Sequence, residues 1–497
     1  MKNNIKYLIS LSWIILLFNT SCTDLPLQMS GVINPADFPK TEDDAKALVT
    51  ACYVPFQSNL YNGIFTVNND GYQIIGDMTT DLGDCQWDNG LWYEAINQSW
   101  TPTTHAIIHH YDYVRKLSEF TMALDKIEKM DSTVMTSQNR KRFIAEVKCA
   151  RGFMGYLLYN WFGPVPVATL AQLSDPLSTE VVPRPTNEEM SAFIEQNLKE
   201  AASDLDYTYL GEDGTFTKGL ANMVLLKLYM HDKKWNLAEI IGRELMDSRY
   251  GYNLVPEYSD IFTYNNQHNN EIIYAAGCDE KVQQLWLAHV LPGQYPTVNT
   301  NIVKWNGYRV PWNFYTTFQT TDKRLKVLVG DFVGTDGIRY WTRYRGNVMV
   351  KGVIPVKYGE DPKAIGEGSS IDWIVYRYAD ALMLTAEAIV RNGNVVTSEA
   401  VEMLDKVRVR AGLPRYEISR YTTTGVDGFL ADILIERGHE LWFEGTRRED
   451  LIRFGKYTEY AISKKSSATA QPYMTLMPIP QSVINEGKGI IKQNPGY

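Results

Sequence analysis

Residues 427–451 constrain the fold most, because charged and apolar residues are interleaved there at helical spacing. Asp427 can cap the start of a helix. An apolar face follows, formed by Phe429, Leu430, Ile433, Leu434, Leu441 and Trp442. Glu436, Glu440 and Glu444 recur every four residues, which predicts that they share one side of this helix. Four arginines lie close by in sequence: Arg437, Arg447, Arg448 and Arg453.

This row of carboxylates has two interpretations. It could be acid–base machinery, or it could be a network of ion pairs that fixes the end of the helix to the rest of the molecule. Charges within an apolar segment usually need partners. The pattern therefore favours the network.

Further helices are predicted over residues 41–54, 109–129, 138–161 and 187–205. The last begins with a capping box formed by Thr186 and Glu189.

Two helix pairs resemble each other, one over residues 220–230 and 235–247 and the other over residues 373–390 and 400–411. Each carries small residues, an aromatic residue and leucines at packing positions, the style of a tetratricopeptide repeat.

The segment between the two pairs, residues 250–371, has a different composition. It is rich in Gly, Pro, Asn and aromatic residues and lacks long helical patterns, although residues 271–275 and 348–350 have the character of short strands. A loop-rich insertion on a rigid helical scaffold is a typical place for binding loops.

Several motifs, taken in order, resemble the SusD/RagB family. They are the segment 436–451 and residues 151–166, 377–387, 407–413, 477–481 and 493–497. Members of this family are surface-anchored nutrient-binding lipoproteins of Bacteroidetes with a scaffold of helical repeats. The resemblance implies a mostly α fold, in which tetratricopeptide-like helix pairs support the loop-rich segment with its short strands at about 250–370.

The amino terminus has the pattern of a bacterial lipoprotein. Lys2 and Lys6 precede an apolar stretch at residues 7–18, which is too short to span a membrane but suits a signal peptide. Cys22 follows small residues and is the expected site of lipid attachment, although Asn19 departs from the usual lipoprotein box. The alternative is ordinary secretion with Cys22 as an incidental thiol. We predict a signal peptide at 1–21, a lipid-anchored tether at 22–40 and a single SusD-like domain at 41–497.

Several classes of function have little support in the sequence. The net charge of −9 argues against a nucleic-acid partner. Motifs typical of hydrolases, phosphate-binding loops and dinucleotide-binding folds are absent, so neither an enzyme nor a cofactor is predicted. His105 and His109 could face one metal ion, but no acidic or cysteine partner has matching spacing. The four cysteines after Cys22 are widely spaced, and we expect them to be mostly unpaired and buried: Cys52, Cys85, Cys149 and Cys278.

Aromatic residues are abundant, with 12 Trp, 31 Tyr and 17 Phe. Residues 81–100 mix tryptophans with short polar side chains and are predicted to form an exposed loop. A sugar needs this mixture, because its apolar face stacks on a ring while its hydroxyls bond to amides and carboxylates. The candidate ligand-binding residues are Trp87, Asp88, Asn89, Trp92 and Asn97, with Tyr295, Trp305 and Trp312 from a second cluster that also holds Tyr308, Arg309 and Tyr315. A third cluster lies at residues 339–344. Each ring could instead belong to the core or to a partner interface.

The resemblance favours the first cluster. Family members commonly carry Asp-Trp-x-Asp-Gly-Gly-Arg-Trp there, and Trp87, Asp88, Gly90 and Trp92 match this pattern. Leu91 stands where the pattern has arginine, so the ligand of starch-binding relatives should not be transferred.

The resemblance implies a glycan-binding lipoprotein of the outer membrane that faces the cell exterior and passes nutrient to a SusC-like TonB-dependent transporter. One alternative is capture of peptides, as on the RagB side of the family. The other is a glycan-degrading enzyme, which no sequence motif supports.

Overall fold

The computed structural model describes residues 38–87, 89–175, 177–207, 214–341, 348–465 and 468–497. The predicted signal peptide, Cys22, most of the tether and Asp88 lie outside these residues. Residues 41–497 form one compact unit. The fold is mostly α, as predicted, with a few short strands.

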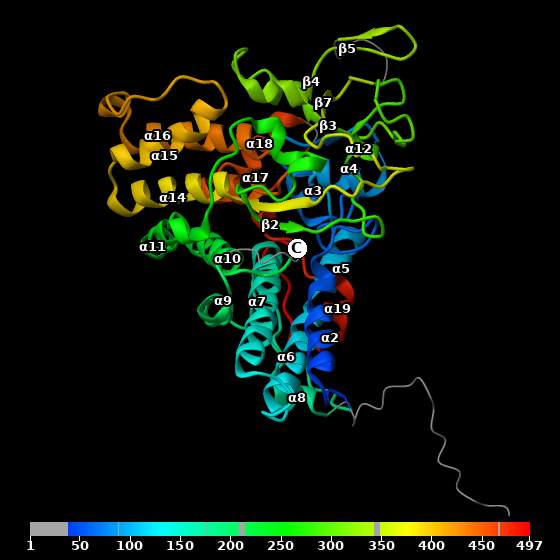
Figure 1. Cartoon of the computed structure of the whole chain (residues 1–497), viewed down its shortest axis with the longest axis vertical. Helices are drawn as coiled ribbons and strands as arrows, with labels where there is room; N and C mark the ends of the chain where they lie inside the picture. Colours follow the sequence, from blue (N-terminus) through cyan, green and yellow to red (C-terminus); the bar gives the residue numbers. More distant parts are fainter. Residues whose placement is uncertain (1–37, 88, 176, 208–213, 342–347, 466–467) are drawn as a thin grey trace, which may run out of the picture. The chain divides into compact units, whose positions relative to one another are not determined.

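Long helices dominate the chain before Tyr250 (Figure 1). The longest is α7 (Ser137–Phe162), which packs against α6 (Val114–Lys129) and α9 (Asn187–Asp204). Thr136 caps α7, and the predicted capping box of Thr186 and Glu189 starts α9. The other helices described before α10 (Lys218–His231) are α2 (Glu42–Tyr53), η2 (Val54–Phe56), α3 (Tyr72–Met78), α4 (Gly90–Asn97), α5 (His105–Tyr111) and α8 (Leu170–Leu173).

The single helix predicted over residues 109–129 is wrong in one respect, because α5 and α6 are separate helices. Between the two helices, backbone N–H groups bond to the carbonyl three residues earlier instead of four. The Tyr113 N–H bonds to the His110 carbonyl, and the Lys116 N–H bonds to the Tyr113 carbonyl. Such a tighter turn interrupts an α-helix without requiring glycine or proline.

Both predicted helix pairs are present. The first is α10 (Lys218–His231) with α11 (Trp235–Leu245), and the second is α14 (Tyr378–Gly393) with α15 (Ser398–Arg410). The two pairs meet where α11 packs on α14. A Cβ at Gly242 would lie 2.3 Å from the Thr385 hydroxyl, so this glycine permits the close approach. Figure 1 shows α10, α11, α14 and α15 running side by side in this order of contact.

The start of the second pair differs from the prediction. Residues 373–377 form strand β8 (Trp373–Arg377), which pairs antiparallel with β2 (Ile272–Ala276). Aromatic and β-branched residues crowd this stretch, and such residues favour a strand over a helix. The β2–β8 pair thus joins the loop-rich segment to the helical scaffold.

The loop-rich segment has the predicted character. Between Tyr250 and Ile371, no helix among the described residues is longer than five residues. One sheet has the strand order β1 (Asp84–Cys85), β3 (Tyr308–Pro311), β7 (Gly352–Pro355) and β4 (Leu328–Val329), and a small sheet pairs β5 (Phe332–Val333) with β6 (Arg339–Tyr340). Residues 348–350, predicted as a strand, form a turn and bend before β7. The elements are β1 (Asp84–Cys85), η3 (Ser248–Tyr250), η4 (Tyr258–Phe262), η5 (Tyr264–Asn266), α12 (Trp286–Val290), β3 (Tyr308–Pro311), α13 (Trp312–Tyr315), η6 (Lys323–Val327), β4 (Leu328–Val329), β5 (Phe332–Val333), β6 (Arg339–Tyr340) and β7 (Gly352–Pro355).

The carboxy-terminal part contains the charged segment. Its helix, α16 (Arg420–Glu440), is interrupted at Gly425 and ends before Glu444. The four-residue spacing predicted Glu444 on one side of this helix, which is wrong, because Glu444 lies in the turn that follows. Phe443 and Gly445 both have positive φ, and they reverse the chain at this point. The remaining elements are α17 (Arg447–Arg453), α18 (Tyr457–Lys464), η7 (Pro472–Thr475) and α19 (Gln481–Glu486).

The predicted ion-pair network is confirmed. Arg377 of β8 is fully buried and bonds to Glu271, Glu440 and Glu444, with nitrogen–oxygen distances of 2.5–2.7 Å. Burial disfavours the charge of Glu440, but the attraction of Arg410, Arg377 and Arg324 outweighs burial and lowers its pKa to about 2. We call Arg377 with its three carboxylates the ion network. It connects the residue before β2, strand β8, the end of α16 and the turn that follows α16.

The four cysteines in the described residues are free thiols, as predicted. Cys52, Cys85 and Cys149 are buried, and Cys278 is half-buried. Burial raises the pKa of Cys52 and Cys85 to about 12. None of the helices that the structure describes is both long enough and apolar enough to cross a membrane.

Candidate ligand-binding site

Two segments far apart in sequence are joined at the first aromatic cluster. Strand β1 pairs with β3, with Asp84 opposite Arg309 and Cys85 opposite Tyr308. The pairing extends by one further hydrogen bond, in which the Gln86 N–H donates to the Gly307 carbonyl at 2.9 Å. This short ladder places Trp87 beside the segment that carries Trp305.

The aromatic cluster consists of Trp87, Trp92, His289, Trp305 and Tyr308. His289, on α12, lies at its centre. Its ring stacks on Tyr308 at 4.4 Å between centroids, and the rings of Trp305, Trp87 and Trp92 lie 4.9, 5.5 and 5.9 Å away. The cluster thus unites residues that the sequence placed in two separate groups.

His289 is an uncharged packing surface. Burial lowers its pKa to about 3, so the ring is neutral at physiological pH. Neither ring nitrogen hydrogen-bonds to any residue that the structure describes. Sequence reasoning missed this residue, because a histidine within an apolar stretch has no characteristic spacing.

The rings of the aromatic cluster differ in exposure. Trp92 and Tyr308 are buried, at 5% and 0% of their surface exposed, whereas Trp87 and Trp305 are half-buried. Gly307 makes room for Trp87, since a Cβ there would lie 2.7 Å from the tip of the indole and 2.8 Å from the His289 carbonyl oxygen. The two half-buried indoles of the cluster therefore pack against buried rings.

Arg309 holds the loops around the aromatic cluster together. Its buried guanidinium donates to the carbonyls of Val290 at 2.8 Å and Val348 at 3.0 Å and to the side chain of Asn306. It forms no salt bridge with a described residue, and burial lowers its pKa to about 9, which still leaves it charged at neutral pH. The sequence suggested that it could bind sugar hydroxyls, but its side chain is fully occupied inside the protein.

The prediction of an exposed loop at residues 81–100 is wrong. Residues 90–97 form α4, which buries Trp92 and Asn97. The Asn97 amide donates to the Tyr93 carbonyl at 2.7 Å within that helix. These two side chains therefore lie in the interior and not on an exposed loop. Asn89, just before the helix, is exposed.

The other predicted residues, Tyr295 and Trp312, pack against rings outside the aromatic cluster. Tyr295 is half-buried and packs on Phe332 at 5.1 Å. Trp312 donates its indole N–H to the Met349 carbonyl at 2.8 Å and meets Tyr315 edge-on. Of the third group, residues 342–344 lie outside the described residues.

His105 and His109 do not form a metal site with neighbouring residues. Their rings stack at 6.3 Å, and the nearest carboxylate oxygen, on Asp70, is 3.6 Å from His109. Across the described ranges, no group of three or more His, Cys, Asp or Glu side chains is arranged to hold a metal ion.

The fold is that of known SusD-like proteins. A SusD homolog from Bacteroides thetaiotaomicron matches with a TM-score of 0.77 at 20% identity, covering 93% of this chain and 98% of that one. Surface glycan-binding protein A from Bacteroides thetaiotaomicron, solved in complex with laminarihexaose, matches with a TM-score of 0.73 at 22% identity, covering 92% and 100%.

The sequence comparisons agree. Residues 304–497 match the SusD family. The SusD-like protein P25 of Formosa agariphila is 23% identical over 94% of both chains. The starch-binding protein SusD of Bacteroides thetaiotaomicron is 30% identical over 33% of this chain and 26% of its own length. The family match over residues 304–497 and the SusD-like relatives along the chain support membership of the SusD/RagB family.

Proposed function

We propose that this protein binds glycans at the aromatic cluster, with Trp87 and Trp305 as the stacking surfaces. The observation that carries this proposal is the pair of half-buried indoles that both contact the ring of the buried, neutral His289. The apolar face of a pyranose stacks on such a ring, and a rigid support lowers the entropy lost on binding. Asn89 and Asp88 are the polar residues proposed to reach sugar hydroxyls beside Trp87.

The relatives support carbohydrate as the ligand class. One is named a starch-binding protein, and another was solved with laminarihexaose. Trp92 and Asn97 enter the proposal as supports of the site, because both are buried. Tyr295 and Trp312 are proposed as outlying contacts for a longer chain.

A binding experiment tests this proposal. The mature protein in detergent should be retained by laminarin or starch in affinity electrophoresis, or else by another glycan of an array. Trp87→Ala and Trp305→Ala should each weaken binding about tenfold to a hundredfold, the effect of losing one stacked ring. The control is Trp235→Ala, which removes an equally half-buried tryptophan at the start of α11.

Two results would contradict the proposal. If the Trp87 and Trp305 variants bind glycans as the parent does, the aromatic cluster is not the site. If a peptide library binds and no glycan does, the RagB-like alternative replaces it. Release of product from a bound polysaccharide would revive the enzyme hypothesis.

Lipid anchoring and a transporter partner complete the proposal. Cys22 would carry the lipid and hold the protein on the outer face of the outer membrane, where it would deliver glycan to a SusC-like TonB-dependent transporter. The Cys22→Ala protein should then leave the membrane fraction of cells that lack the transporter. Its retention there would count against the lipid anchor.

A further inference from the structure

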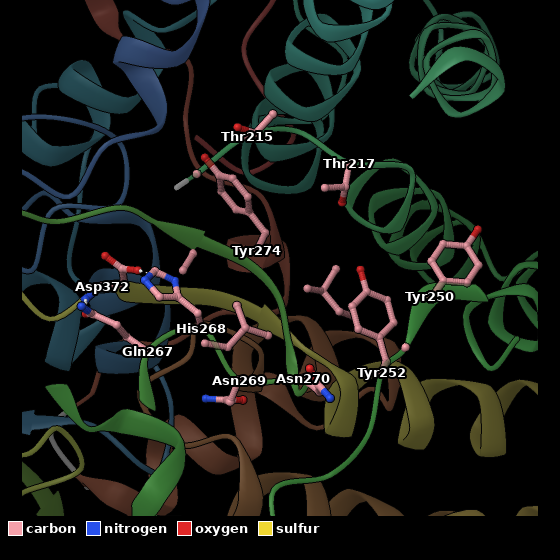
Figure 2. A pocket seen from close by; sticks show the side chains of 15 residues that line it. Thr215, Thr217, Tyr250, Tyr252, Gln267, His268, Asn269, Asn270, Tyr274 and Asp372 are labelled. Atoms are coloured by element: carbon pink, nitrogen blue, oxygen red, sulfur yellow. Dashed lines mark hydrogen bonds and ion pairs between the residues drawn. The ribbon is translucent and has the colours of Figure 1, made fainter. Parts of the chain in front are cut away.

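A pocket of about 380 Å³ lies beside strand β2 (Figure 2). Its walls come from the chain before α10, from the turn after η3, from the residues leading into β2, and from β2 itself. It shares no lining residue with the aromatic cluster. Its volume falls in the range of small-ligand sites, about 300–1,000 Å³.

One wall of this pocket is aromatic and rigid. The rings of Tyr250 and Tyr252 stack at 5.7 Å with 20° between their planes. The Tyr250 hydroxyl accepts from the Asn222 amide at 2.7 Å. The Tyr252 hydroxyl fits against α10, where a Cβ on Gly219 would lie only 1.9 Å from it. Figure 2 shows this hydroxyl directed toward Thr217, on the same side of the pocket.

The facing wall is polar. Gln267 accepts from the Asp372 N–H at 3.0 Å, and this bond leaves its amide nitrogen for another acceptor. The Asn270 side chain is exposed and makes no hydrogen bond with a described residue. His268 is half-exposed, with a ring nitrogen 3.9 Å from Asp372. Figure 2 places Gln267, His268 and Asp372 together across from the two tyrosines.

The charge of the lining defines the ligand. Among the described lining residues there is no lysine or arginine, and the one carboxylate among them, Asp372, has His268 beside it. Phosphate and carboxylate ligands would need a cation, so they do not fit. Tyr250 is buried, so the half-buried ring of Tyr252 is the aromatic surface of this wall. A tyrosine ring opposite amides suits a neutral molecule with an apolar face and a rim of hydroxyls.

We infer that this pocket is a second ligand site that holds one or two neutral sugar units. The inference rests on the proposed function only for the class of ligand, because the two sites share no residue. A separate small pocket would let the protein hold one end of a short oligosaccharide, or a second chain, independently of the aromatic cluster.

The test removes the first site and then measures the second. Trp87→Ala and Trp305→Ala are combined, and binding of maltotriose, laminaritriose, cellobiose, mannobiose and xylobiose is measured by saturation-transfer NMR. At least one of these sugars should still bind. Adding His268→Ala and Asn270→Ala should then weaken that binding at least tenfold. The control is Asn265→Ala, an exposed asparagine in η5 outside the pocket.

The outcomes separate the two proposals. If none of these sugars binds the doubly substituted protein, or if binding survives the His268 and Asn270 changes, the pocket is not a sugar site and the aromatic cluster stands alone. Binding of trialanine in place of sugars would also overturn the inference. If the tryptophan changes leave glycan binding intact and the pocket changes abolish it, the aromatic cluster fails and the pocket remains.

Discussion

The ion network contains a buried arginine and the loops around the aromatic cluster contain another, but the two arginines have different partners. Arg377 bonds to three carboxylates, whereas Arg309 bonds to backbone carbonyls and one amide. The first arrangement is strong and specific, and it joins a strand to the end of a helix. The second spreads one cation over several loop carbonyls, and this fixes the shape of a surface. Buried charge therefore supports the scaffold in one region and a candidate binding face in the other.

The largest expected effect comes from breaking the ion network. Arg377→Met would leave Glu271, Glu440 and Glu444 buried with fewer partners, which should lower the free energy of unfolding by about 3–5 kcal/mol or more. Urea unfolding measures this loss. The matched control is Arg243→Met, because Arg243 pairs with Glu399 at the surface and such a pair contributes about 0–1 kcal/mol. Equal losses from the two variants would show that the network adds nothing special to stability.

The next prediction distinguishes the buried ring of Trp92 from the half-buried ring of Trp87. Trp92→Ala should lower the unfolding free energy by about 3 kcal/mol, because it leaves a cavity in the core. Trp87→Ala should cost clearly less stability and should mainly weaken glycan binding. Thermal unfolding and affinity electrophoresis of the same two proteins check this. The reverse pattern would mean that Trp87 is the core residue.

Much of the scaffold was predictable because its signals are local. The capping box at Thr186 and the small-residue patterns of both helix pairs are properties of neighbouring residues, and the structure reproduces them. The prediction failed where a distant partner decides the outcome. Residues 373–377 were assigned to the helix that follows them; their aromatic and β-branched residues also suit a strand, and pairing with the distant β2 makes them β8.

The site was predictable only in part, for the same reason. Trp87 and Trp305 were both identified from composition, but their meeting at His289 depends on the β1–β3 ladder. Trp92 is buried because it lies on α4. The sequence prediction missed this helix because the many Asp and Asn residues of the segment indicated a loop. Arg309 and His289 carry no sequence signature of a supporting role, because their partners are carbonyls and rings from distant segments.

Acid should weaken both regions through neutral histidines. His289 lies in the aromatic cluster, and His439 lies at the end of α16. Burial lowers the pKa of both to about 3, and nearby arginines add to this for His439. The unfolded pKa is about 6.5, so the unfolded chain binds the proton first as the pH falls. Above about pH 6.5 neither histidine lowers the free energy of unfolding. As the pH falls from 6.5 toward 3, each histidine lowers it progressively, by about 2 kcal/mol at pH 5.

Unfolding measured at pH 7.5 and pH 5 tests this expectation. His289→Gln and His439→Gln should each reduce the loss between these two pH values by about 2 kcal/mol. Asp77 acts in the opposite direction, because burial raises its pKa to about 7 and it favours the folded state as the pH falls from 7 to 4. Since both variants retain Asp77, the comparison isolates the histidines. An unchanged loss in His289→Gln would mean that water reaches the interior of the aromatic cluster.

The smallest expected effect concerns a single methyl group beneath Trp87. In Gly307→Ala, the new Cβ would meet both the indole tip and the fixed His289 carbonyl oxygen, so the ring has to move. This overpacking should lower the unfolding free energy by about 1 kcal/mol, and glycan affinity should fall with the displaced ring. The control is Gly293→Ala in a nearby turn, where a Cβ would meet nothing within 4 Å. If Gly307→Ala binds glycans as tightly as Gly293→Ala does, the position of Trp87 is not what the ligand requires, and the rigid support inferred for the aromatic cluster loses its role.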